Sequence, residues 1–336
     1  METLVSSWSK TAQTLPESYV FPVGERPGSV EVPSCKNIPS IDLASHGSET
    51  VEELLAACQE FGFFQVINHG VPEDLIDDAR KVVKDFFDMA DEEKAKLYST
   101  DRSKTAKLFT SSYSYGDEKH HFWRDNLRHP CHPVDETIHL WPEQPTNYRD
   151  VVSKYSSEVR KLSLRILELI CEGLGLKAGY FGEEFTGVQM FSVNHYPACP
   201  DPSLTLGTPK HADHNLLTML LQGSVSGLQV FNDGQWLGVE PLPHAFVVNI
   251  GHQLQIISNG KLKSAEHRAV TNSKEARTTI VNFIQPRPDT IVEPANSIVG
   301  DIVPLYRPFV YKDFLKFYED KFGDTEALMD VYKIKP

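Results

Sequence analysis

Long apolar runs and basic clusters are both absent from this sequence, and each absence excludes a class of protein. No apolar stretch approaches the roughly 20 residues that a membrane-spanning helix needs, and the N-terminus lacks the apolar core of a signal peptide. The 336 residues carry a formal net charge of -13. This charge is unsuited to nucleic acid or to an anionic membrane surface, so we expect neither as a partner.

Cysteine is also scarce. The five cysteines are scattered and odd in number, and no two have the CxxC spacing. A disulfide framework and a zinc knuckle are therefore both disfavoured. Dispersed thiols are typical of a reducing compartment, and the last residues form neither a prenylation box nor a peroxisomal address. We expect a cytoplasmic protein that acts as a monomer.

The N-terminal half predicts a scaffold of helices and strands. Thr50-Val51-Glu52-Glu53 has the form of a helix capping box, and apolar residues then recur with helical spacing. An apolar stripe from Asn147 to Glu172 predicts one long bracing helix, ended by glycines. We divide this half into a polar arm, a scaffold domain and the bracing helices, at residues 1–37, 38–145 and 146–186.

The pattern changes to short strands from Gly187 onward. Asn232-Asp233-Gly234 and Asn259-Gly260 are hairpin signals, and the second predicts strands over 255–258 and 261–264. Eight or so closely spaced strands favour a jelly-roll sandwich or barrel. The expected class is α+β, with an all-β core over 187–290 and a C-terminal helical segment over 291–336.

His211-Ala212-Asp213 begins a stretch that starts polar and ends apolar, which we predict as one strand from His211 to Leu221. Residues i and i+2 of a strand share a face, so the imidazole and the carboxylate would project together. His267, on another predicted strand, can supply a third ligand. Two histidines and one carboxylate form the facial arrangement of non-haem Fe(II) oxygenases. The pattern alone is also compatible with ordinary structural histidines.

A second polar group supports the metal interpretation. Arg277 and Thr279 share the apolar face of a predicted core strand with Val281. A guanidinium on such a face is costly unless it meets an anion, and a neighbouring hydroxyl suits a carboxylate. Asn194 and Tyr196 share one face of another strand. These features together predict a metal centre beside an anchor for a dicarboxylate.

The segment from Lys107 to Trp123 is predicted to be irregular and is rich in aromatic residues. Loops of this kind carry specificity in many proteins. Phe109, Tyr113 and Trp123 are our candidates for contacts with an organic substrate. A hydrophobic flap packed on the core explains the same residues equally well.

From about residue 38 to the C-terminus, the chain resembles the plant 2-oxoglutarate/Fe(II)-dependent dioxygenases. Within that family it is most similar to the hyoscyamine hydroxylase/epoxidase-like group. The motifs that carry the resemblance are His211-Ala212-Asp213, His267, Arg277-Thr278-Thr279, Asn194 to Pro200, Phe63 to Gly70, Asn259-Gly260 and Glu266-His267-Arg268, with Cys131-His132-Pro133 and Trp141-Pro142-Glu143 for the group.

The resemblance implies a double-stranded β-helix core with the C-terminal segment near the mouth of the active site. It implies Fe(II), 2-oxoglutarate and O2, with ascorbate in a supporting role. The implied iron ligands are His211, Asp213 and His267, and the implied 2-oxoglutarate contacts are Arg277, Thr279, Tyr196 and Asn194. The family usually has serine where Thr279 stands and aspartate where His252 stands.

The implied activity is the oxidation of a small plant specialised metabolite such as an alkaloid, with release of succinate and CO2. Hydroxylation is the expected outcome, with epoxidation or desaturation as variants of the same chemistry. The run from Leu108 to Tyr115 contains no acid to pair with an ammonium. A neutral phenylpropanoid, flavonoid, terpenoid or hormone is therefore an alternative substrate to an alkaloid. Aromatic side chains could still bind the ammonium of an alkaloid by cation–π contact.

Two other classes fit part of the pattern. A zinc hydrolase also uses two histidines and a carboxylate, but it leaves the inward Arg277 unexplained. A non-catalytic β-barrel that binds a small molecule has no use for three metal ligands.

Overall fold

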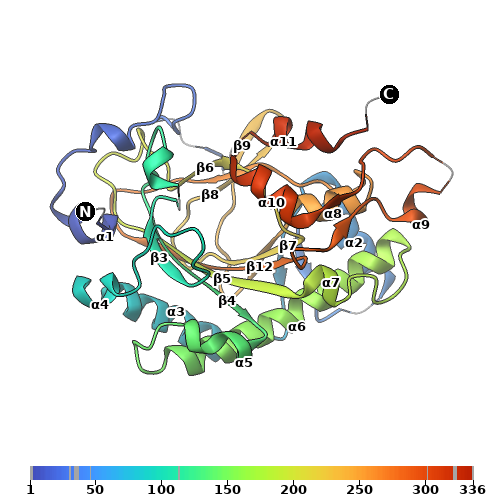
Figure 1. Cartoon of the computed structure of the whole chain (residues 1–336), viewed down its shortest axis with the longest axis horizontal. Helices are drawn as coiled ribbons and strands as arrows, with labels where there is room; N and C mark the ends of the chain where they lie inside the picture. The colour runs from blue at the N-terminus through green and yellow to red at the C-terminus, as the bar shows by residue number, and fades with distance from the viewer. Residues whose placement is uncertain are drawn as a thin grey trace.

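Two β-sheets face each other in the centre of the protein (Figure 1). The structure is a computed structural model that describes residues 3–29, 32–33, 38–45, 47–112, 114–300, 302–320 and 324–334. The larger sheet has the order β1 (Ser40–Asp42), β2 (Phe63–Ile67), β10 (Phe246–Ile250), β7 (Leu217–Leu221), β12 (Arg277–Gln285), β5 (Val188–Tyr196), β4 (Asp125–His132) and β3 (Lys107–Thr110). The smaller has the order β6 (Thr208–His211), β11 (His267–Ala269), β8 (Leu228–Asn232) and β9 (Gln235–Gly238).

Helices cover the outer face of the larger sheet, where α2 (Ser48–Glu60) and α3 (Glu73–Asp88) both pack on the long helix α6 (Tyr148–Leu174). The apolar side of α6 is buried, as its helical spacing predicts. Gly175 follows α6 with a left-handed φ of 69°, the conformation that commonly ends a helix. The long bracing helix and the mixed fold with a jelly-roll core are thus confirmed.

Both halves of the chain build the larger sheet. Strands β1 and β2 lie at one edge, β4 and β3 at the other, and β10, β7, β12 and β5 lie between them. Strand β12 pairs with β5 over nine residue pairs, from Arg277 opposite Tyr196 to Gln285 opposite Val188. Segments 38–145 and 187–290 therefore share one sheet and one continuous row of backbone hydrogen bonds.

Shorter helices and a small ribbon complete the fold. Helix α8 (His252–Ile257) follows β10, and a two-stranded ribbon joins β13 (Ile291–Val292) to β14 (Phe309–Val310). Helices α10 (Tyr311–Asp320) and α11 (Thr325–Tyr332) end the described chain. The remaining short helices are α1 (Val5–Trp8), α4 (Asp91–Ala95), α5 (Val134–Thr137), α7 (Glu183–Thr186) and α9 (Asn296–Val299), with 3-10 turns at Ser9–Thr11, Glu17–Tyr19, Tyr115–Asp117 and Ile138–Leu140.

The hairpin predicted around Asn259-Gly260 is wrong, because the residues before it form helix α8. Asn259 and Gly260 have positive φ angles of 51° and 79°. The Gly260 amide donates to the Gln255 carbonyl at 2.8 Å, which closes the end of a helix in the manner of a Schellman motif. An apolar run beside Asn-Gly suits a buried helix as well as a strand, and tertiary burial decided between them.

Two further boundaries differ from the predictions. Strand β6 ends at His211 and the next strand begins at Leu217, so His211 and Asp213 do not lie on one strand. The segment from Lys107 to Trp123 is not wholly irregular, because Lys107–Thr110 forms the edge strand β3. In both places polar and apolar residues are mixed, so the sequence pattern does not locate the end of the strand.

Cys58, Cys131, Cys171 and Cys199 are free and buried, and Cys35 lies outside the described residues. Among the helices of the described ranges, none combines the length and the apolar character that crossing a membrane requires.

Truncation of the α6 core should destabilise the fold. Ile166 is fully buried, so Ile166→Ala should lower the free energy of unfolding by about 2–5 kcal/mol, measured by chemical denaturation. Lys161→Ala on the exposed side of α6 is the control, because the ion pair of Lys161 with Glu158 is solvent-exposed and contributes less than about 1 kcal/mol. Equal losses in the two variants would contradict the assigned core.

Candidate metal and co-substrate site

Strand pairing brings two histidines together. His211 closes β6 and His267 opens β11, and the two residues are directly opposite in this antiparallel pair, with ring centroids 4.2 Å apart. Each ring is oriented by a hydrogen bond from Nδ1 to the carbonyl two residues earlier, at 2.9 Å to Pro209 and 3.2 Å to Ala265. A proton on Nδ1 leaves each Nε2 atom with a lone pair that can bind a metal.

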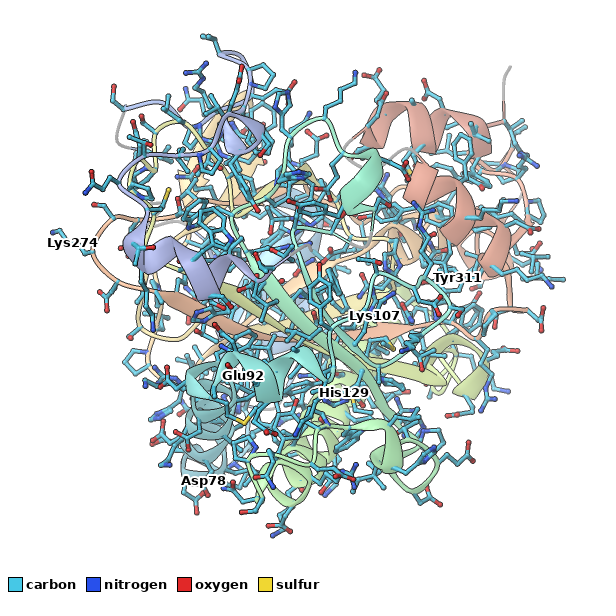
Figure 2. All side chains as sticks on the ribbon, turned by 60° about the vertical axis from the view of Figure 1, so that its left-hand side comes forward. Asp78, Glu92, Lys107, His129, Lys274 and Tyr311 are labelled. Carbon is cyan, nitrogen blue, oxygen red and sulfur yellow. The ribbon has the colours of Figure 1, made fainter. Side chains whose placement is uncertain are left out.

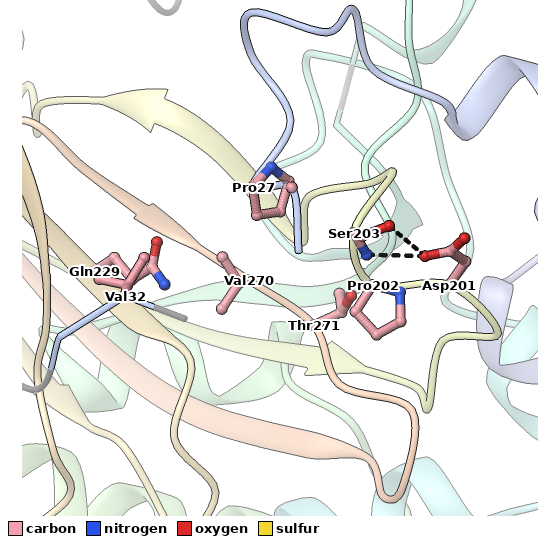
Figure 3. A pocket seen from close by; sticks show the side chains of 9 residues that line it. Pro27, Val32, Asp201, Pro202, Ser203, Gln229, Val270 and Thr271 are labelled. Atoms are coloured by element: carbon pink, nitrogen blue, oxygen red, sulfur yellow. Dashed lines mark hydrogen bonds between the residues drawn. The ribbon is translucent and has the colours of Figure 1, made fainter. Parts of the chain in front are cut away.

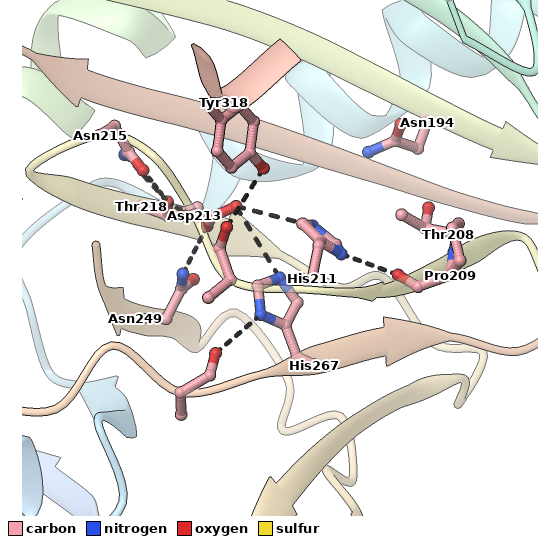
Figure 4. A network of polar contacts seen from close by, with 12 residues as sticks. Asn194, Thr208, Pro209, His211, Asp213, Asn215, Thr218, Asn249, His267 and Tyr318 are labelled. Atoms are coloured by element: carbon pink, nitrogen blue, oxygen red, sulfur yellow. Dashed lines mark hydrogen bonds and ion pairs between the residues drawn. The ribbon is translucent and has the colours of Figure 1, made fainter. Parts of the chain in front are cut away.

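Asp213 supplies the third donor from the connection between β6 and β7. Its Oδ2 accepts hydrogen bonds from Thr218 Oγ1 at 2.6 Å and Asn249 Nδ2 at 2.5 Å. Its Oδ1 lies 3.7 Å from His211 Nε2 and 3.9 Å from His267 Nε2. Figure 4 shows the three side chains converging, and their donor atoms lie within 4.8 Å of one another. This donor set fits a divalent iron ion with open positions on one side.

The electrostatics of the triad suit metal binding. Burial raises the pKa of the Asp213 carboxyl, but His267, His211 and the two hydrogen bonds lower it more strongly, so the net pKa lies below its usual value. Burial, and then the neighbouring His267, lower the pKa of His211. At neutral pH, Asp213 is therefore ionised and His211 is neutral, which are the states that bind a cation.

The backbone around Asp213 is also held from two sides. The His252 amide donates to the Asp213 carbonyl at 2.8 Å, and the Tyr318 hydroxyl of α10 donates to the Ala212 carbonyl at 3.1 Å. A Cβ at Gly251 would lie only 2.0 Å from the Asn215 carbonyl oxygen, so this close approach requires glycine. The His252 ring is buried, and neither of its nitrogens has a hydrogen-bond partner among the described residues.

Arg277 lies on the inner side of the larger sheet and is almost fully buried. Its Nε donates to the Val225 carbonyl at 3.0 Å, and one terminal nitrogen donates to Gln222 Oε1 at 3.3 Å. A Cβ at Gly227 would approach the Arg277 side chain to 3.0 Å, so glycine leaves room for the guanidinium. Burial lowers the pKa of Arg277, and no described carboxylate forms an ion pair with it.

The other predicted co-substrate residues lie on the same face. Thr279 is opposite Asn194 and Arg277 is opposite Tyr196 in the β12–β5 pairing. The Tyr196 ring centroid is 5.4 Å from the Arg277 guanidinium carbon, and its hydroxyl is 3.3 Å from Thr208 Oγ1. At Arg277 the inner face therefore presents a buried cation with hydroxyl groups near it, which fits a carboxylate of 2-oxoglutarate.

Sequence reasoning missed several polar side chains of this region. Thr218 and Asn249 hold Asp213, and both interrupt otherwise apolar runs, which was a usable signal. Asn194 Oδ1 accepts hydrogen bonds from Asn126 and Arg124 of the β4 region at 2.7 and 3.2 Å. These last contacts depend on strand neighbours far apart in the chain, so no local pattern indicated them.

The three aromatic substrate candidates have different environments. Phe109 is buried in β3, opposite Asn126, and so faces the inner side of the sheet. Trp123 is fully buried in a cluster with Val5, Tyr19 and Cys199, and its indole N–H donates to the Pro197 carbonyl at 3.0 Å. This environment gives Trp123 a packing role against the N-terminal arm. Tyr113 lies outside the described residues.

Two surface cavities lie away from the triad. The one in Figure 3, of about 360 Å³, is lined by residues of the arm, the 201–203 loop and the outer face of the smaller sheet, where Gln229 lies. The other, of about 820 Å³, lies between the α7 region and residues 287–293. Gln229 points away from the face that carries His267, because neighbouring strand residues alternate.

The facing sheets and the His-Asp-His triad define a non-haem iron oxygenase. The sequence profile of the 2OG-Fe(II) oxygenase superfamily matches residues 187–286, and that of the non-haem dioxygenase in morphine synthesis N-terminal region matches residues 38–146. The chain belongs to the 2OG-Fe(II) oxygenase superfamily, and it is an enzyme that uses iron and 2-oxoglutarate. The suspected resemblance is thereby confirmed.

Similar proteins cover the whole chain. Hyoscyamine 6-dioxygenase of Hyoscyamus niger is 42% identical over 99% of this chain and 99% of its own. Flavanone 3-dioxygenase 2 of Oryza sativa subsp. japonica is 41% identical over 95% and 94%. The crystal structure of JOX2 in complex with 2OG, Fe and JA matches with a TM-score of 0.90 at 33% identity, covering 100% of this chain and 98% of that one.

The hydroxyl of Thr218 should control the strength of metal binding through Asp213. Thr218→Val keeps the shape but removes the hydrogen bond, and we expect Fe(II) affinity to fall about ten-fold or more, as for other groups that orient metal ligands. Thr218→Ser is the control, because it keeps the hydroxyl. Metal titration of the two variants is the measurement, and identical affinities would show that the hydroxyl does not support the ligand.

Proposed function

We propose that His211, Asp213 and His267 are the iron ligands of this dioxygenase. The convergence of two Nε2 atoms and one carboxylate oxygen within 4.8 Å is the observation that carries the proposal. The orienting hydrogen bonds of both rings and of the carboxylate support it, because ligands that are already oriented lose little freedom when a metal binds.

We propose that Arg277 binds the distal carboxylate of 2-oxoglutarate, with Thr279, Tyr196 and Asn194 around it. The support is the burial of the guanidinium without a carboxylate partner in the described chain, since a buried cation is costly until an anion meets it. Thr279 carries a hydroxyl on the inner face beside it.

The proposed reaction is hydroxylation of a small plant metabolite, with succinate and CO2 as the other products. When bound, iron and 2-oxoglutarate supply the oxidative decarboxylation that makes attack on an unactivated C–H bond feasible. The chain's own residues hold 2-oxoglutarate, orient the substrate and exclude water. Epoxidation and desaturation are variants of this chemistry that the same ligands support.

The names of similar proteins point to more than one class of substrate. One of them is named for hyoscyamine and another for flavanone, so alkaloid and flavonoid substrates both lie within reach of this fold. The alkaloid hypothesis needs a group that accepts an ammonium, and that requirement can be checked against the charges near the triad.

Release of CO2 tests the reaction class. The wild-type enzyme with Fe(II) should release labelled CO2 from 1-labelled 2-oxoglutarate only when O2 is present. Asp213→Ala should lose this release together with bound iron, whereas Asp233→Asn at an exposed turn should keep both. A wild-type enzyme that releases no CO2, or an active Asp213→Ala variant, would refute the proposed function or its ligand set.

The co-substrate anchor has its own test. Arg277→Lys keeps the charge but loses the two-pronged geometry of a guanidinium. We expect the apparent affinity for 2-oxoglutarate to fall about ten-fold or more, from the roughly 1.5–3 kcal/mol of a charged hydrogen bond. Arg160→Lys, on α6 beyond the outer face, is the matched control, because the two described hydrogen-bond partners of Arg160 both lie in α7. Equal affinity in all three proteins would place the carboxylate elsewhere.

A further inference from the structure

Two cations lie directly opposite each other on the inner face of the larger sheet. Lys107 of β3 and Arg128 of β4 are paired residues, and Asn126, which reaches Asn194 on the inner face, is two residues from Arg128. Alternation therefore turns Arg128 inward and His129 outward. Figure 2 shows His129 beside the helical layer, where it stacks on Trp141. Like charges directly opposite in a sheet are destabilising.

The two cations differ in what surrounds them. Lys107 Nζ donates to the Asp101 carbonyl at 3.0 Å and lies 5.9 Å from the Phe109 ring centroid, and the charges of Asp101 and Glu319 act on it. The Arg128 side chain is partly buried, and among the described residues this side chain makes no hydrogen bond, ion pair or ring contact. A guanidinium that is partly removed from water without an acceptor loses free energy, so an anion that reaches Arg128 would be bound favourably.

The position of Arg128 relates it to the metal centre. The Tyr311 hydroxyl lies 2.9 Å from His214 Nδ1, next to Asp213 in the chain. Burial raises the pKa of Tyr311, whereas the charge of Arg128 lowers it. Arg128 therefore lies near enough to Tyr311 for its charge to act on that hydroxyl, and it projects from the inner face of the sheet, on which Arg277 also lies.

Arg128 is also distinct from the co-substrate anchor. Arg128 is opposite Ser192 on β5, whereas Arg277 is opposite Tyr196 on the same strand. Four residues of strand separate the two positions, or roughly 13 Å along β5. One bound 2-oxoglutarate is accounted for by Arg277, so Arg128 is left for another molecule.

Among the described residues of this region, no carboxylate is available for a cationic substrate. Glu118, the acid nearest to the Ser111 turn, accepts hydrogen bonds from the hydroxyls of Ser111 and Ser112, and the His121 ring lies 2.9 Å away. The Glu118 side chain is only 8% exposed, so its carboxylate is already occupied by these contacts. Asp213 faces the metal position, and Glu319 is exposed and acts on Lys107.

We propose that the organic substrate of this enzyme carries a carboxylate, and that Arg128 binds this group on the inner face of the β3–β4 edge. Lys107 adds a positive charge beside it. This inference rests on the proposed function, since it assigns the substrate class of the same site. It disfavours an ammonium-bearing alkaloid, because two cations would face the ammonium.

Binding of matched compounds tests the charge preference. The probes are 3-phenylpropanoate and indole-3-propanoate, each compared with its primary amide and with the corresponding amine. Dissociation constants are measured by calorimetry without O2, on the full chain loaded with Fe(II) and 2-oxoglutarate, so that Arg277 is already occupied. We expect each acid to bind about ten-fold or more tightly than its amide, with the amine weakest.

Variants connect the preference to Arg128. In Arg128→Gln the acid-to-amide ratio should fall to near one, and Arg128→Lys should restore part of it. The 2-oxoglutarate affinity and the melting temperature should stay at wild-type values in both. Arg80→Gln removes the same charge from the exposed side of α3 and should keep the wild-type ratio.

Several results would overturn the inference. The first is tighter binding of an amine than of its acid. The second is equal binding of acid and amide, or no binding of either, for both the phenyl and the indole compounds. The third is an acid preference in Arg128→Gln as large as in the wild type. A loss of 2-oxoglutarate affinity in Arg128→Gln would instead assign Arg128 to the co-substrate. Failure of the proposed function is separate, because it would appear as absent O2-dependent CO2 release in the wild type.

Discussion

The pairing of His211 with His267 across two antiparallel strands is the constraint on which the centre depends. Neither strand is long, and both belong to the smaller sheet. Opposite residues of such a pair hold their Cβ atoms about 5 Å apart, so the register brings the two imidazoles together and the Nδ1 hydrogen bonds then orient them. A slip of one residue would turn one ring to the opposite face. The hydrogen bonds that orient Asp213 come from β7 and β10 of the other sheet, so the triad joins the two sheets.

The strands of the larger sheet separate two tasks by their alternation. The outer face of β4, β5 and β12 presents Leu127, Phe191 and Ile280 to the buried core under the helices. The inner face of the same strands presents amides, hydroxyls and guanidinium groups. Buried polar groups of this kind lower stability unless they are paired. The apolar outer face and its helices offset that cost, and they allow the inner face to stay charged.

Much of this organisation could be predicted from the sequence, and the failures have identifiable causes. The stripe of α6, the jelly-roll class and the triad follow from local periodicity and a short motif. Thr218 and Asn249 stand out in the sequence as polar residues within apolar runs, but only the β10–β7 pairing, which places them opposite each other, shows that they hold Asp213. Arg128 was missed for a different reason. A single arginine in a polar stretch has no distinguishing pattern until its cross-strand neighbour is known to be Lys107. The Asn259-Gly260 hairpin failed because the same dipeptide can also end a helix.

The strand order has a consequence for how the chain reaches its fold. The four central strands come from the C-terminal half, and the N-terminal half supplies both flanks. These flanks are synthesised first and have no sheet to join until β5, β7, β10 and β12 exist. Contacts of such large sequence separation are slow to form, and a chain of this size exposes strand edges without partners until these contacts are made. Once formed, the flanks cover the edges of the catalytic strands against pairing with other molecules. The scaffold half thus shields the core against pairing with other chains, and because both halves complete one sheet, neither half has a full set of strand partners without the other.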